Sequence, residues 1–182
     1  MSVFIESERL YIRELQPGDA AGMYEMDADP EVHKYVGKTP VQSLKQSEDV
    51  VAFIRQQYTD FGIARWAVVE KGTDEFAGWT GFKFMKGPIN GLSDYYDFGY
   101  RLKRKFWGRG YATESGHAAL HYGIKEHGFK DIYAMTDVDN AASRRVLEKL
   151  GFELSGIFNY DAEPTWREAG EPTTMYKWLQ NQ

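Results

Sequence analysis

The chain of 182 residues contains no cysteine. It therefore cannot form disulfides, cysteine-ligated zinc sites or iron–sulfur clusters, and it has no thiol nucleophile. Long hydrophobic runs are also missing, because the longest apolar segments span only a few residues, too few to cross a bilayer. Residues Met1–Arg9 lack the apolar core of a signal peptide. We therefore expect a soluble, cytoplasmic protein that does not bind membranes.

Positive charge is in the minority, since 22 Lys and Arg residues against 27 Asp and Glu residues give a formal net charge of −5. A net-acidic surface disfavours broad electrostatic binding to nucleic acid. The apolar content of 42% is nevertheless too high for a disordered chain. No repeat, low-complexity tract or linker divides the sequence, so we expect a single domain over residues 1–182.

The hydrophobic pattern predicts strands and helices along the whole chain. We expect strands at 10–15, around 66–68, and at 76–85, 96–102, 131–136, 152–158 and 174–178. We expect helices at 17–26, 31–36, 43–61, 109–127 and 140–150. A helix between strands 96–102 and 131–136 permits parallel pairing, whereas the short connections of the first half favour antiparallel neighbours. The result is a mixed sheet with helices on both faces.

The most informative segment runs from Tyr100 to Glu114 and reads Tyr-Arg-Leu-Lys-Arg-Lys-Phe-Trp-Gly-Arg-Gly-Tyr-Ala-Thr-Glu. It predicts a strand that passes through a Gly-x-Gly turn, Gly108 to Gly110, into a helix. Such a turn directs free backbone N–H groups at one point, where the helix dipole favours a phosphate or pyrophosphate. Basic residues surround the turn: Arg101, Lys103, Arg104, Lys105 and Arg109. The alternative is a tight turn with a solvated charged rim.

Sequence detail excludes several other sites. A P-loop needs a Lys after its second glycine, and a dinucleotide-binding loop needs a third glycine where Thr113 stands. No Gly-x-Ser-x-Gly motif is present. His117 and His121 have the spacing of a metal pair, but Ala118 replaces the Glu of His-Glu-x-x-His. The segment 137–140 suggests a calcium loop, but Ala142 stands where that loop needs glycine. We therefore expect no metal.

Lys105-x-x-Gly-x-Gly-Tyr-Ala112 is followed further along the chain by Asn140-x-x-Ser143 and Leu-Gly-Phe152. This combination resembles the GNAT superfamily of N-acetyltransferases, and Trp-Gly-x-Gly-Tyr-Ala-Thr-Glu resembles its RimJ/RimL branch. The opening segment 8–15 and the Asp-Pro-Glu-Val at 29–32 also resemble that branch, so the resemblance spans nearly the whole chain. One departure is Lys105, where the superfamily more often has Gln or Arg.

The resemblance implies a GNAT-like α/β (α+β) fold, with a mixed, mostly antiparallel sheet of six to seven strands and helices on both faces. Its two central strands, 96–102 and 131–136, would be parallel and splay apart at their C-terminal ends. Acetyl-CoA would enter this V as co-substrate, with its pyrophosphate on residues 108–113 and its pantetheine arm near Leu102. The acetyl-CoA-binding residues implied are Leu102, Lys103, Lys105, Trp107, Gly108, Arg109, Gly110, Tyr111, Ala112, Thr113, Asn140 and Ser143.

The same resemblance implies direct attack of a neutral amine on the thioester, so the protein must position and deprotonate the amine. Many GNAT enzymes carry a tyrosine acid where Leu147 stands, so Ser143, placed near the sulfur, becomes the predicted hydrogen-bond donor. Asn140 would bind the pantetheine arm; without the resemblance, it is simply a helix N-cap. Asp97, where the branch usually has Glu, would relay the ammonium proton through water. Tyr100 is expected in the core.

The acceptor class is left open by the sequence. A primary amine is implied, either a protein N-terminal α-amine or a small-molecule amine such as a polyamine, an amino acid or an antibiotic. The loop 160–171, rich in acidic and aromatic residues, would border the acceptor mouth or form solvated surface. A non-catalytic acyl-CoA-binding module is an alternative, as is an RNA-associated protein using segment 101–109, which the net negative charge disfavours. We expect a monomer or homodimer.

Overall fold

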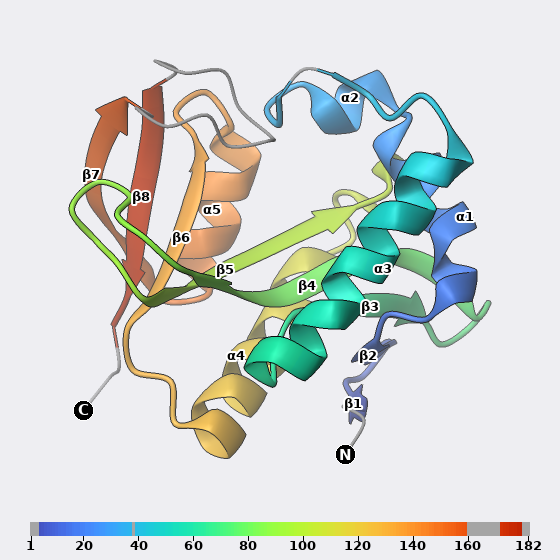
Figure 1. Ribbon diagram of the computed structural model, residues 1–182, viewed down its shortest axis with the longest axis horizontal. Helices are drawn as coiled ribbons and strands as arrows, with labels where there is room; N and C mark the ends of the chain where they lie inside the picture. Colours follow the sequence, from blue (N-terminus) through green and yellow to red (C-terminus); the bar gives the residue numbers. More distant parts are fainter. Residues whose placement is uncertain (1–3, 38, 160–171, 180–182) are drawn as a thin grey trace.

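The computed structural model describes residues 4–37, 39–159 and 172–179. Eight strands within these residues form one sheet in the order β1-β2-β3-β4-β5-β6-β8-β7 (Figure 1). Their bounds are Phe4–Glu6 (β1), Leu10–Glu14 (β2), Arg65–Glu70 (β3), Glu75–Met85 (β4), Tyr95–Leu102 (β5), Ile132–Asp137 (β6), Phe152–Asn159 (β7) and Pro172–Trp178 (β8). All neighbouring strands are antiparallel except β5 and β6, which are parallel.

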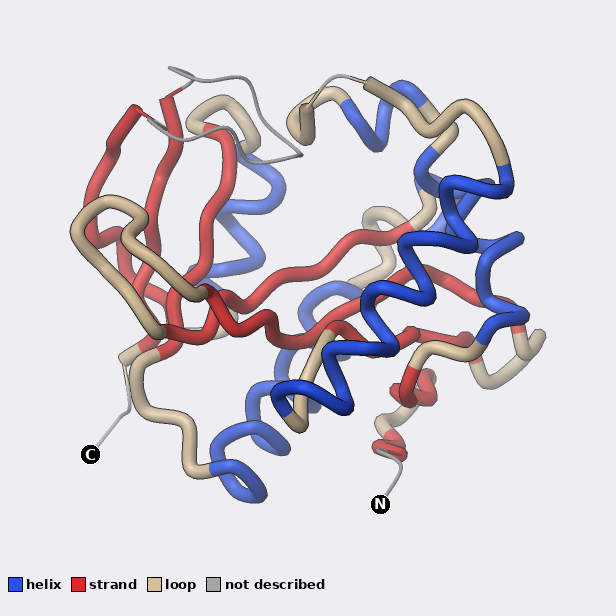
Figure 2. Tube along the Cα trace, in the orientation of Figure 1, coloured by secondary structure: helices blue, strands red, loops and turns tan. Residues whose placement is uncertain are grey.

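Helices cover both faces of the sheet, as Figure 2 shows by colour. Their bounds are Ala20–Asp27 (α1), Pro30–His33 (α2), Leu44–Phe61 (α3), Tyr111–His127 (α4) and Ala141–Lys149 (α5), with short 3₁₀ turns at Pro17–Asp19 and Arg104–Phe106. Helices α1 and α3 pack on one face over a core that includes Met23, Met26 and Val51. Helices α4 and α5 pack on the other face, over a core that includes Trp66, Phe82 and Phe152. Among the described helices, none has the length and apolar character needed to cross a membrane.

The fold class expected from the sequence is confirmed, including the parallel central pair. The sheet has eight strands rather than six to seven. The extra strand is β1, whose three residues have only Ile5 partly buried, so no alternation of apolar and polar residues marks it. The second predicted helix, 31–36, is also shorter in the structure, because α2 ends at His33. The stripe of small residues predicted on α4 is buried, and it includes Gly116, Ala119 and Gly123.

The two central strands part after a very short pairing. Strand β5 pairs with β6 only at Tyr96–Ile132 and Asp97–Tyr133. Beyond Asp97, β5 continues to Leu102 along β4, while β6 continues along β8. In Figures 1 and 2 the two strands diverge, with α2 and the turn between β6 and α5 facing one another across the opening. The edge of β5 that faces this opening therefore has no β6 partner from residue 98 onward.

Candidate functional site

The Gly-x-Gly turn lies at the end of the splayed strand β5. Gly108 and Gly110 adopt φ values of +73° and +82°, the left-handed region in which other residues are strained. Gly110 is the N-cap of α4, and at this helix start no side chain supplies a capping hydrogen bond. The first-turn N–H groups of an uncapped helix are left for a ligand. The turn therefore combines two left-handed glycines with a helix start that no side chain caps, and anion binding there stays a prediction.

The basic side chains around the turn are paired with carboxylates. Lys105 forms ion pairs with Glu75, and Arg109 lies 3.4 Å from Glu70. The hydrogen bond to Glu75 raises the pKa of Lys105, and the hydrogen bond from Tyr111 lowers the pKa of Glu70. Two further cations, Arg101 and Arg104, pair with Asp27 and Asp29 at 2.8 and 3.3 Å. The local basic excess is thus offset by acidic partners, and the backbone is the main feature left to bind an anion.

Two of the predicted binding residues, Lys103 and Trp107, bond to other groups of the protein. Lys103 is only 5% exposed and pairs with Glu25 and with Glu75, the latter at 3.1 Å. The Trp107 indole is 47% exposed, yet its Nε1 donates a hydrogen bond to the Leu102 carbonyl at 2.8 Å. These contacts fasten the turn to the end of β5. They place Lys103 in a supporting position and leave the Trp107 side chain about half exposed.

Asn140 and Ser143 lie at the start of α5, on the other side of the opening. The Asn140 Oδ1 accepts a hydrogen bond from the Ser143 backbone N–H at 3.1 Å, so Asn140 is the N-cap of α5. The Tyr100 hydroxyl donates to the Ser143 carbonyl at 2.8 Å and lies 3.1 Å from the Ser143 Oγ. Burial raises the pKa of Tyr100, so the phenol stays neutral and acts as a hydrogen-bond donor. Tyr100 therefore links β5 to α5 across the splay.

The Tyr100–Ser143 contact was not predicted from the sequence, which places Tyr100 in the core. Its ring does pack against the core, but its hydroxyl reaches Ser143. The alternation of Phe98, Tyr100 and Leu102 puts all three on one face. A buried tyrosine hydroxyl requires a polar partner, so this alternation predicts that the Tyr100 hydroxyl has one. It did not identify that partner, because α5 is distant in sequence.

Asp97 forms an ion pair with Arg65, which the sequence did not associate with it. The Arg65 guanidinium also donates to the Asp97 carbonyl at 2.8 Å and to the Gly81 carbonyl. Burial raises the pKa of the Asp97 carboxyl, while the positive charge of Arg65 opposes that rise. A Cβ on Gly99 would lie 3.1 Å from the Arg65 Nη2, so the missing side chain makes room for the guanidinium.

The two predicted catalytic residues lie on opposite faces of the sheet. Asp97 is paired with Lys83 across β4 and β5, and Arg101 is paired with Trp79 on the same face. Trp79 packs against the core beneath α1 and α3. Tyr100, which bonds Ser143, faces α4 and α5 instead. Asp97 therefore lies on one face of β5, and the Tyr100–Ser143 pair lies on the other. Asp97 and Ser143 are not in contact.

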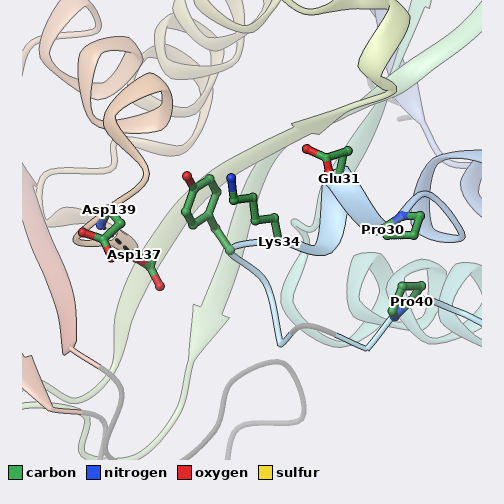
Figure 3. Close-up of a pocket in the computed structure, with 7 residues that line it drawn as sticks. Pro30, Glu31, Lys34, Pro40, Asp137 and Asp139 are labelled. Carbon is green, nitrogen blue, oxygen red and sulfur yellow. Dashed lines mark hydrogen bonds between the residues drawn. The ribbon is translucent and has the colours of Figure 1, made fainter.

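A pocket of about 550 Å³ lies across the opening of the splay, between the α2–α3 segment and the turn after β6 (Figure 3). Its lining comprises Pro30, Glu31, Lys34, Tyr35, Pro40, Asp137 and Asp139. Asp137 Oδ1 accepts a hydrogen bond from the Asp139 backbone N–H at 2.8 Å. Three carboxylates and one ammonium group give the pocket an acidic lining. The loop 160–171, expected to border the acceptor mouth, lies outside the described residues.

The family model that matches this chain describes acetyltransferases, and similar proteins include two acetyltransferases. Residues 9–153 match the family model of the acetyltransferase (GNAT) domain. The uncharacterized N-acetyltransferase p20 of Bacillus licheniformis is 31% identical over 151 residues, which cover 83% of each chain. The FsC-acetyl coenzyme A-N(2)-transacetylase of Aspergillus fumigatus is 30% identical over 166 residues, covering 86% of this chain and 70% of that protein.

Solved structures with similar folds include an acetyltransferase (GNAT family) from Bacillus anthracis, with a TM-score of 0.78, 26% identity and coverage of 97% of this chain and 98% of that chain. A RimL ribosomal L7/L12 alpha-N-protein acetyltransferase in complex with coenzyme A superposes with a TM-score of 0.79. It is 18% identical, over 97% of this chain and 98% of that chain. At 18% identity, the similarity to the RimL structure concerns the fold alone.

The Arg65–Asp97 ion pair leads to a stability prediction. Arg65→Met leaves a buried carboxylate unpaired, which should lower the free energy of unfolding at neutral pH by about 3–5 kcal/mol. Burial raises the pKa of Asp97, and in the described part of the chain only the positive charge of Lys83 opposes that rise once Arg65 is removed. The unpaired carboxyl therefore binds a proton as the pH falls, and the difference from wild type should shrink in acid.

Urea unfolding of both proteins at neutral and acidic pH measures this difference. The double variant Arg65→Met/Asp97→Asn carries no charge at this position, so its deficit should vary less with pH. An Arg65→Met deficit that is equal at both pH values would contradict the assignment of the loss to an unpaired carboxylate.

Proposed function

This chain belongs to the GNAT family and is an N-acetyltransferase that uses acetyl-CoA; we propose that its acceptor is a primary amine that attacks the thioester directly. The observation that carries the proposal is the splay of β5 from β6 with the uncapped Gly-x-Gly turn at the end of β5. The splay offers an extended ligand one unpaired strand edge and an anion site at its end. It also leaves an approach from each face of the sheet.

For acetyl-CoA we propose the pyrophosphate on the turn and first helical residues, 108–113. The N–H groups at the start of α4 and the helix dipole supply the positive field, because the neighbouring cations already have carboxylate partners. The pantetheine arm lies along the unpaired edge of β5 near Leu102, with Asn140 on the opposite side. Lys105, Arg109 and Trp107 border this path, and Lys103 supports it from beneath.

We assign Ser143 the role of hydrogen-bond donor to the sulfur of the leaving thiolate. The supporting observation is that Tyr100 holds Ser143 at the edge of the splay through its carbonyl and its Oγ. Because Tyr100 uses its only hydroxyl proton at the carbonyl, the Ser143 hydroxyl can donate either to the Tyr100 oxygen at 3.1 Å or to a ligand, and we propose that it turns to the sulfur when acetyl-CoA is bound. A serine hydroxyl is a poor acid, so full protonation of the thiolate falls to solvent.

We assign Asp97 the role of relaying the proton of the attacking amine through water. It is the last β5 residue paired with β6, so it lies where the V closes. Its pKa, raised by burial, brings the carboxyl closer to the range of a useful base. Arg65 holds it in place from β3. Since Asp97 and Tyr100 lie on opposite faces, amine deprotonation and thiolate stabilisation take place on opposite sides of the sheet.

For the acceptor we propose a protein N-terminal α-amine or a small-molecule amine. The pocket lined by Glu31, Asp137 and Asp139 suits a group that arrives as an ammonium. The Aspergillus fumigatus relative is named for acetyl transfer to an N(2) nitrogen, which supports an amine acceptor. An assay of acetyl-CoA consumption with a broad amine panel tests the function. A protein that binds CoA but consumes no thioester with any amine would instead be an acyl-CoA-binding module.

The turn is tested by Gly110→Val, which places a branched side chain where the pyrophosphate is proposed to lie and should weaken CoA binding at least about tenfold. Gly110 has a φ of +82°, so the substitution also strains the backbone. The matched control is Gly128→Val at the other end of α4, where φ is +66° and no atom lies within 4 Å of a built Cβ. Calorimetry that finds equal CoA affinity in both folded variants would remove the turn from the binding site.

The proposed relay predicts that Asp97→Asn affects two kinds of amine differently. An α-amine with a pKa near ~8 is largely neutral at mildly alkaline pH and needs little help, whereas a lysine-type amine near ~10.4 depends on a base. The loss of kcat/KM should therefore be much larger for the second kind. Asp19→Asn is a suitable control, because Asp19 is a buried carboxylate paired with Arg13. Equal losses for both amine types would exclude Asp97 as the relay.

Ser143→Ala should lower kcat while leaving acetyl-CoA affinity nearly unchanged. Removing one hydrogen-bond donor to a developing charge costs about 1–3 kcal/mol, or roughly ten- to a hundredfold in rate. Steady-state kinetics and CoA calorimetry measure the two effects separately. Ser155→Ala on β7, an exposed serine, is the control. A variant that keeps full kcat, or that loses activity only through weaker CoA binding, would show Ser143 to be a helix-start residue without a catalytic role.

A further inference from the structure

The turn between β1 and β2 contacts the first turn of α4, although the two are more than 100 residues apart in sequence. The Ser7 Oγ donates to Glu114 Oε1 at 2.7 Å, and the Arg9 backbone N–H donates to the same oxygen at 2.8 Å. The Arg9 Nε and Nη2 lie 2.7 and 2.6 Å from Glu114 Oε2. Both oxygens of the Glu114 carboxylate are thus held by this one segment.

Arg9 also contacts the Gly-x-Gly turn directly. Its Nη1 donates to the Arg109 carbonyl at 2.9 Å, and its guanidinium lies 4.7 Å from the centre of the Tyr111 ring. A Cβ built on Gly110 would lie 3.4 Å from the Arg9 Nη2. One side chain therefore contacts Arg109 and Tyr111 and borders the space beside Gly110, between them. The Arg9 side chain remains 44% exposed beside the turn.

The position of Glu114 creates an electrostatic conflict for an anionic ligand. A carboxylate in the first turn of a helix interacts favourably with the helix dipole when no ligand is bound. The same carboxylate repels a pyrophosphate bound at that helix start. Burial acts to raise the pKa of Glu114, but hydrogen bonds from Arg9 and Ser7 hold it below its ordinary value, so the group stays charged. Its charge must therefore be compensated locally.

We infer that Arg9 is a positioning residue for acetyl-CoA, which neutralises Glu114 and fixes the Arg109–Gly110 peptide so that the turn accepts the pyrophosphate. This inference rests on the proposed placement of acetyl-CoA at residues 108–113. Of the other cations near the turn, Lys105 and Arg109 pair with Glu75 and Glu70 and not with Glu114. Arg9 is therefore the side chain that cancels the carboxylate nearest the start of α4.

The test is a charge rescue measured by CoA calorimetry. Arg9→Met should weaken CoA binding about five- to tenfold, the range expected for an uncompensated charge at a helix end. Glu114→Gln keeps the shape and the acceptor oxygen for Ser7 but removes the charge. The double variant Arg9→Met/Glu114→Gln should therefore recover most of the lost affinity. Because the repulsion is screened by salt, the loss in Arg9→Met should also shrink at high ionic strength.

The matched control is Arg13→Met, which breaks a comparable ion pair with Asp19 at 2.8 Å near the other end of β2. It should leave CoA affinity unchanged. Arg9→Lys, which keeps the positive charge, should bind CoA far better than Arg9→Met, and it serves as the test if Arg9→Met does not fold.

Three results would overturn the inference: unchanged CoA affinity in folded Arg9→Met, no recovery in the double variant, or equal weakness in Arg9→Lys and Arg9→Met. A merely structural role for Arg9 would lower the free energy of unfolding but leave the CoA affinity of the folded variant unchanged, and urea unfolding of the same variants measures that effect separately. If the wild-type chain itself does not bind CoA, the proposed function is wrong. That result is independent of the Arg9 variants, so the two failures can be distinguished.

Discussion

The pairing of β5 with β6 over two residue pairs is the constraint on which the site depends. A longer parallel ladder would satisfy the backbone groups of β5 from residue 98 to the Gly-x-Gly turn and would close the space between the strands. The divergence is maintained from both sides. Strand β4 holds β5 along its whole length, and β8 holds β6 through Asp137. The cross-splay hydrogen bonds of Tyr100 then fix the start of α5 against β5.

Much of this architecture follows from local sequence signals. The long helices α3 and α4, the strands of the second half and the Gly-x-Gly turn all lie close to where periodicity and turn chemistry predict them. Strand β1 was missed, because an edge strand of three residues that buries only part of one side chain has no periodic pattern. The loop 160–171 stays a prediction for the acceptor mouth.

The site was harder to predict than the fold, because its decisive contacts join distant segments. The sequence proposes Asp97 and Ser143 as catalytic residues, but it does not show that Arg65 on β3 pairs with Asp97 or that Tyr100 on β5 contacts Ser143 on α5. The sequence predicts that basic residues surround a phosphate site at the turn, with a solvated charged rim as the alternative. Their partners Glu70 and Glu75 lie on β3 and β4, so only the folded chain shows that the charges are compensated. Local motifs therefore suggest candidate residues, whereas the partners that hold these residues and balance their charges depend on the fold.

The pairing of the basic residues near the turn with carboxylates also affects how fast an anionic ligand associates. An uncompensated cluster of cations attracts anions over about a Debye length, speeds their diffusional encounter and makes the association rate fall steeply with salt. Here Lys105, Arg109 and Lys103 each have a carboxylate partner, and the chain as a whole carries a formal charge of −5. With acetyl-CoA placed as we propose, recognition of its pyrophosphate at this turn is therefore a short-range process. In that placement the ligand is selected after contact, by backbone N–H groups, rather than attracted from a distance by the protein's electrostatic field.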